Sequence, residues 1–143
     1  MKPPIEASEA KESTRSWWSS PGVVYFITAG SPPLAVKIGM AAQTGKNTLI
    51  STLKRRLSAI QSSNHELVRL VGLKYFSEGD YPTRDAEIFE RELHLEFHEL
   101  QRFKPHSRGA EWFDATTELM EKISQISVPP SEFGVPELYG EKV

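Results

Sequence analysis

The chain has 143 residues, of which 38% are hydrophobic and 25% charged, a composition typical of one soluble globular domain. It has no cysteine, which excludes disulfides and thiolate metal sites, and no apolar run long enough to span a membrane. The net charge of −2 is unevenly distributed: residues 34–75 carry seven basic side chains and one acidic, whereas residues 76–143 carry seven basic and fifteen acidic. The basic segment is suited to attract phosphates, although a solvated helix face gives the same pattern.

Residues 1–20 are polar, contain several Ser, Glu and Lys residues, and show no hydrophobic periodicity. They predict a flexible N-terminal tail without the apolar core of a signal peptide, so we expect a cytoplasmic (intracellular) protein. Trp17 and Trp18 are the exception. We expect this pair to fold back onto the edge of the domain, and partner binding or base stacking is the alternative.

Two β-rich segments, residues 23–29 and 34–40, are bounded by Gly and Pro and predict a hairpin. Each contains one residue of chemical interest, Tyr25 in the first segment and Lys37 in the second. If these two residues lie opposite each other in an antiparallel pair, the turn is centred on Ser31.

The rest of the chain alternates between helical and extended patterns. Residues 48–62 show apolar residues at helical spacing, and Arg56 borders that apolar stripe. The further predicted elements are a strand at 67–76, a long helix at 84–103 with Thr83 as its cap, a loop at 104–110, and a last helix at 116–126. The predicted order is therefore β-β-α-β-α-α, an α/β (α+β) domain over residues 21–127 followed by a C-terminal tail at 128–143.

Glu90 is a carboxylate on the apolar face of the long helix. It follows Ala86 by four residues and precedes Leu93 by three, which places all three on one face. A carboxylate in this position has to be paired, hydrogen-bonded or bound to a metal. A salt bridge, for example to Arg56, is the structural interpretation, and a divalent-cation site is the functional one. His94 lies at i+4 and is a secondary candidate for the same site.

Four short motifs occur in order along residues 22–125. They are Val23-Val24-Tyr25, Lys37-Ile38-Gly39, Arg56-Leu57, and Ala86 followed at i+4 by Glu90. Together they resemble the GIY-YIG nuclease superfamily, in which the first two motifs are Gly-Ile-Tyr and Tyr-Ile-Gly. The Lys-Ile-Gly variant and a Glu111-Trp112-Phe113 near the end resemble a narrower subfamily of phage and bacterial proteins.

The resemblance implies a fold, a reaction and a set of site residues. The fold is a small three-stranded antiparallel sheet flanked by helices, and the reaction is phosphodiester hydrolysis with one divalent metal, Mg²⁺ or Mn²⁺, per active site. By resemblance, Tyr25 is the general base, Arg56 stabilises the scissile phosphate and Glu90 holds the metal. Lys37 replaces the second tyrosine, and a neighbouring ammonium group favours a phenolate at Tyr25.

The sequence therefore predicts a metal-dependent DNA endonuclease whose catalytic residues are Tyr25, Lys37, Arg56 and Glu90, converging on one face of the sheet. Its substrate is duplex or single-stranded DNA, and the further nucleic-acid-binding candidates are Lys46, Lys54 and Arg55. The alternatives are a catalytically inactive nucleic-acid-binding module and a protein-interaction module on the same fold. A homodimer and phage, mobile-element or host-defence settings all agree with the resemblance.

Overall fold

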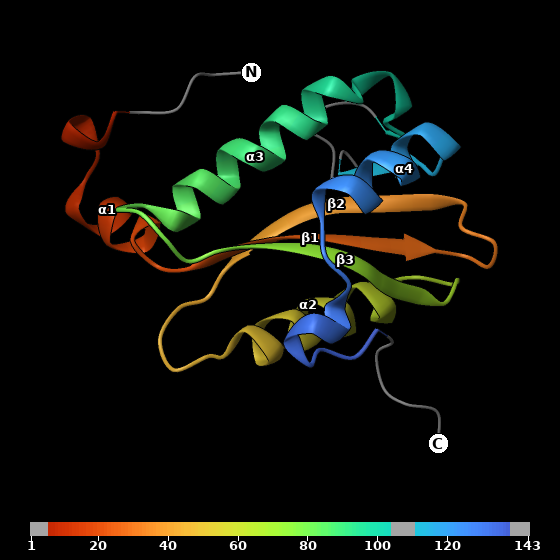
Figure 1. Cartoon of the computed structure of the whole chain (residues 1–143), viewed down its shortest axis with the longest axis horizontal. Helices are drawn as coiled ribbons and strands as arrows, with labels where there is room; N and C mark the ends of the chain where they lie inside the picture. Colours follow the sequence, from red (N-terminus) through yellow and green to blue (C-terminus); the bar gives the residue numbers. More distant parts are fainter. Residues whose placement is uncertain (1–5, 104–110, 138–143) are drawn as a thin grey trace.

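The computed structural model describes residues 6–103 and 111–137 (Figure 1). Three short 3-10 turns accompany the helices and strands. In chain order the elements are η1 (Ala7–Glu9), α1 (Glu12–Trp18), β1 (Gly22–Ala29), β2 (Ala35–Ala42), α2 (Leu49–Ser62), β3 (Val68–Phe76), α3 (Pro82–Glu96), η2 (His98–Leu100), β4 (Trp112–Asp114), α4 (Thr117–Ile126) and η3 (Pro130–Phe133). The predicted loop at 104–110 and the outer parts of both predicted tails lie outside the described residues.

The strands form one antiparallel sheet in the order β3-β1-β2-β4. The fold is α+β as expected, but the sheet has four strands where three were predicted. The additional strand, β4, has only three residues, too few for an alternating pattern to stand out in the sequence. The predicted order also omitted α1, because that helix buries only Trp18 and has no apolar periodicity.

The register of the hairpin differs from the expected one. Tyr25 is paired with Gly39, two residues beyond Lys37, so the centre of the turn is Pro32 and not Ser31. The difference decides which residue lies under the Tyr25 ring. A glycine takes that place, and the lysine lies closer to the turn.

The sheet is covered on both faces, so β1 is buried along its whole length. Helices α3 and α4 lie on one face, and α2 with η3 lies on the other (Figure 1). The side chains of β1 alternate between these two cores. The core under α2 includes Val23, Tyr25, Ile27, Leu53 and Leu57, and the core under α3 and α4 includes Val24, Phe26, Ile38, Leu93 and Leu119.

The start of α2 is fixed by a capping box between Thr48 and Ser51. The long helix begins and ends differently from the prediction: α3 starts at Pro82, and Thr83 is buried and donates its hydroxyl proton to Ser20 O and Pro21 O instead of capping the helix. It also ends at Glu96, because the chain tightens into the 3-10 turn η2 before residue 103.

Parts of both predicted tails pack on the domain. Trp18 is buried with its ring edge-on to Tyr81, as expected for a pair that folds back, whereas Trp17 is exposed. Beyond α4, Val128 forms a β-bridge with Leu73, and Val135 is buried in the core under α2. Within the described ranges, no helix is both long and apolar enough to cross a membrane.

Candidate active site

The Tyr25 side chain lies directly over Gly39. A Cβ atom placed on Gly39 would be 2.5 Å from the Tyr25 hydroxyl oxygen and 2.6 Å from Cζ, distances that real contacts do not allow. The missing side chain is therefore what lets the ring cross β2 toward the side away from β1. The glycine of the Lys-Ile-Gly motif has a steric role, and its backbone is not in the left-handed region.

The pKa of the Tyr25 phenol lies strongly above its ordinary value. Desolvation is the largest cause; the Arg56 charge opposes it, and the charges of Glu111 and Glu90 add to it. The phenol is therefore neutral at pH 7 in the absence of an added cation. Arg56 is the cation that favours its ionised form.

Glu90 points a carboxylate oxygen into a buried position without a partner. Its Oε2 atom is inaccessible to solvent and accepts no hydrogen bond. Burial is the main cause that raises the Glu90 pKa to about 8; the Glu111 charge raises it further and the Lys37 charge lowers it. In the described part of the chain no ion pair joins Glu90 to Arg56, so the structural interpretation of Glu90 as a salt-bridge partner of Arg56 is not realised.

Lys37 is held by Glu111. Lys37 Nζ lies 2.5 Å from Glu111 Oε2, and this ion pair joins β2 to the residue just before β4. The Glu111 charge also raises the pKa values of Tyr25 and Glu90. Sequence reasoning assigned Glu111 no chemical role; the available signal was an acidic residue placed directly before two aromatic residues that dock on the sheet.

His94 is hydrogen-bonded to the backbone of β2. Its Nε2 atom lies 2.8 Å from Ile38 O, and because a carbonyl only accepts, Nε2 carries the proton. Its ring lies 5.0 Å from that of Phe113, and burial lowers its pKa below the ordinary value. These contacts make His94 a packed, hydrogen-bonded histidine that orients α3 against β2.

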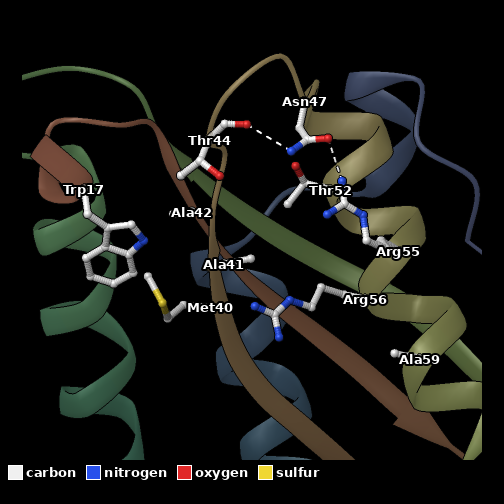
Figure 2. A pocket seen from close by; sticks show the side chains of 10 residues that line it. All are labelled: Trp17, Met40, Ala41, Ala42, Thr44, Asn47, Thr52, Arg55, Arg56 and Ala59. Carbon is white, nitrogen blue, oxygen red and sulfur yellow. Dashed lines mark hydrogen bonds between the residues drawn. The ribbon is translucent and has the colours of Figure 1, made fainter. Parts of the chain in front are cut away.

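Arg56 and Arg55 line a cavity of about 420 Å³ between α1 and α2, which we call the α1–α2 groove. Trp17 forms the opposite wall, and β2 from Met40 to Ala42 forms the floor (Figure 2). Lys54 and Lys46 are exposed but do not line the groove.

The predicted catalytic residues come from both faces of the sheet. Tyr25 and Arg56 belong to the α2 side and Glu90 to the α3 side, and these helices cover opposite faces (Figure 1). The Arg56 and Glu90 charges nevertheless both act on the Tyr25 phenol, and the Lys37 charge acts on Glu90. The expected single face is therefore replaced by an electrostatic link between the two faces through Tyr25, whose ring lies over Gly39.

The residues present fit a cation held mainly by substrate and water. Among residues 6–103 and 111–137 no cluster of three His, Asp or Glu side chains forms a complete cage. One buried carboxylate oxygen without a partner, on Glu90, is the donor that the site offers. Mg²⁺ is commonly bound by one or two carboxylates plus waters and phosphate oxygens, so this donor set suits it.

The chain forms a small α+β domain in which a buried phenol, Tyr25, interacts electrostatically with Arg56 and Glu90. The T5orf172 domain family matches residues 22–127, and the chain belongs to this family. The domain is found in phage and bacterial nuclease-like proteins. No curated protein and no solved structure matches the chain.

Proposed function

We propose that this protein is a metal-dependent DNA endonuclease of the GIY-YIG type. The observation that carries the proposal is the buried Glu90 carboxylate, whose Oε2 has no partner and whose charge acts on the Tyr25 phenol. A fold that only needed stability would not keep such a carboxylate, because burying it without a partner is costly. Membership of a family found in nuclease-like proteins supports the same conclusion.

Glu90 is the residue that would hold Mg²⁺ or Mn²⁺. A divalent cation bound there would supply positive charge that neutralises the scissile phosphate and lowers the pKa of the nearby phenol. Because the Glu90 pKa is about 8 without the cation, cation binding displaces a proton and strengthens as pH rises toward that value.

Tyr25 acts as the general base in this proposal. Its Oη accepts a proton from the attacking water while the water oxygen forms the new bond to phosphorus and the phosphodiester bond to the leaving oxygen breaks. A neutral buried phenol is a poor base, so the positive charge of Arg56 is needed to favour the phenolate.

Arg56 binds the scissile phosphate in this proposal. Its guanidinium lines the α1–α2 groove and its charge acts on the Tyr25 phenol, which supports a phosphate-binding role beside the general base. Lys37, held by Glu111, adds positive charge near Glu90 and keeps the site from becoming too acidic for a phosphate.

The experiment is plasmid nicking with added Mg²⁺ or Mn²⁺, comparing wild type with Tyr25→Phe and Glu90→Gln. Each substitution removes one functional group with little change of volume, and we expect a loss of roughly 100-fold or more in rate. Two matched controls are Tyr75→Phe, which removes a β3 hydroxyl that donates to Gln43 Oε1 just after β2, and Glu92→Gln on an exposed turn of α3.

Cleavage by Tyr25→Phe and Glu90→Gln at the wild-type rate would refute the proposal. A wild type that binds DNA in a salt-dependent manner but never cuts it, with any divalent cation, would support the catalytically inactive nucleic-acid-binding module instead.

A further inference from the structure

The α1–α2 groove combines an aromatic wall with a basic wall. Trp17 lies on one side and Arg55 and Arg56 lie on the other, above the part of β2 that β4 does not cover (Figure 2). Trp17 lies outside residues 22–127, the range matched by the family. The family match therefore assigns it no role.

Trp17 is exposed, but the helix that carries it is anchored to the domain. Its neighbour Trp18 has only 4% of its surface exposed, against 38% for Trp17. The Trp18 ring packs edge-on against Tyr81, and the Arg84 guanidinium lies 5.2 Å from its centre. Since one turn of helix carries both residues, anchoring Trp18 fixes the backbone of Trp17 at the groove that its side chain lines.

The basic wall of the groove, Arg55 and Arg56, is suited to bind an anion. Arg55 Nη2 donates to Asn47 Oδ1 at 2.5 Å, and Asn47 in turn donates to Thr44 O, so this guanidinium is oriented before any ligand arrives. Arg56 has no hydrogen-bond or ion-pair partner within the described ranges. None of the described residues that line the groove is acidic. Two guanidinium groups without a neighbouring carboxylate favour phosphate oxygens as ligands.

We propose that the α1–α2 groove binds a single-stranded segment of DNA, with one unpaired base stacked on the Trp17 indole and adjacent phosphates bound by Arg55 and Arg56. This inference rests on the proposed function, because Arg56 belongs to both the groove and the candidate active site.

An aromatic wall facing a basic wall favours the binding of single-stranded DNA over duplex DNA. An indole stacks on the face of a base, and in a duplex each base face is covered by the neighbouring base pairs. Phosphate contacts alone would not distinguish the two forms. The groove thus predicts that the strand to be cut enters the site with at least one base unstacked.

The test measures binding without cleavage. Fluorescence anisotropy of a labelled oligodeoxynucleotide, and of the same strand in a duplex, is recorded in EDTA for wild type, Trp17→Ala and Trp17→Phe. We expect Trp17→Ala to weaken single-strand binding by about 5- to 150-fold, the effect of losing one stacked base. Trp17→Phe should retain most of the affinity, and duplex binding should not change.

Two further variants complete the design. Phe103→Ala removes another exposed aromatic side chain, beside Leu34 and Ala35 at the other end of β2, and should leave single-strand binding unchanged. Arg56→Ala should lower the slope of log affinity against log salt by about 0.7, the value for one phosphate of a single strand.

Wild-type single-strand affinity in Trp17→Ala, or an equal loss for strand and duplex, would overturn the groove proposal. The two proposals fail separately. Trp17-dependent binding by a protein that never cuts DNA would refute the nuclease alone, whereas cleavage with Trp17-independent binding would refute the groove alone.

Discussion

At the scale of single residues, the contact between Tyr25 and Gly39 sets the geometry of the site. The ring lies where a Cβ on residue 39 would stand, so the two positions are coupled sterically. The Lys-Ile-Gly motif therefore has two distinct parts. Its glycine makes room for the phenol, and its lysine binds Glu111.

Gly39→Ala should displace the Tyr25 ring and destabilise the protein by about 1–3 kcal/mol, the usual cost of overpacking a core. The measurement is urea unfolding of Gly39→Ala, Tyr25→Leu and the double variant. A smaller side chain at position 25 should reduce the cost of the alanine, giving a favourable coupling free energy. Additive costs would show that the ring does not occupy this space.

The raised pKa of Glu90 predicts how the stability of the protein depends on pH. Its pKa rises from the ordinary 4.5 to about 8 on folding, so between these values the folded state binds a proton that the unfolded state has lost. The stability that this proton contributes is complete below pH 4.5 and is lost as pH rises through 8. Wild type should therefore lose stability relative to Glu90→Gln between pH 5 and 9, by an amount on the order of a few kcal/mol.

Urea unfolding of wild type and Glu90→Gln at pH 5 and pH 9, in EDTA, measures the difference in their free energies of unfolding. Glu92→Gln is the matched control because Glu92 is exposed on the same helix. A constant difference between wild type and Glu90→Gln across the pH range would mean that Glu90 titrates normally and is not buried as described.

Motif residues could be predicted from the sequence, whereas a contact between distant side chains could not. The motifs pointed to Tyr25, Arg56 and Glu90, and in the structure the Arg56 and Glu90 charges both act on the Tyr25 phenol. Glu111 was missed because its approach to Lys37 joins positions 74 residues apart in the chain. A long-range side-chain contact of this kind leaves no local spacing to detect.

At the scale of elements, α1 is attached to the domain by one of its two tryptophans. Trp18→Ala should destabilise the protein by about 3–5 kcal/mol, the range for truncating a buried aromatic side chain. Trp17→Ala should change the free energy of unfolding by no more than about 0.5 kcal/mol, because Trp17 is exposed. Thermal or urea unfolding of the two variants measures their losses of stability. Equal losses in Trp18→Ala and Trp17→Ala would contradict the docking of α1 through Trp18.

Elements with strong periodicity were predicted well, and short ones were not. The leucine stripe of α2 and the apolar run of β3 gave bounds within one residue of the observed ones. The three residues of β4 and the seven of α1 owe their conformation to pairing and packing with distant residues. Local pattern carries little information about such segments.

At the scale of the whole molecule, the sheet separates charges of opposite sign. Helix α2 contains three basic and no acidic residues, whereas α3 on the other face contains two basic and five acidic ones (Figure 1). The basic residues of α2 thus make its face basic, whereas Lys74 of the same segment lies over Phe76 and Phe89 on the α3 side. An acidic protein can present such a face to DNA.

Duplex DNA binding in EDTA should weaken steeply with salt, and Lys54→Ala and Lys46→Ala should each reduce the slope of log affinity against log salt by about 0.9. Filter binding or anisotropy over a salt series gives the slope. Glu92→Gln, on the acidic face, should leave it unchanged. If the lysine variants keep the wild-type slope, DNA does not lie along α2.

In the described part of the chain, β4 pairs only with Ala35–Lys37, and no strand continues along β2 from Gly39 to Ala42. A longer strand there would add backbone hydrogen bonds and protect the sheet edge from unwanted pairing. It would also lie beside the floor of the α1–α2 groove, Met40 to Ala42, and narrow the entrance to the groove.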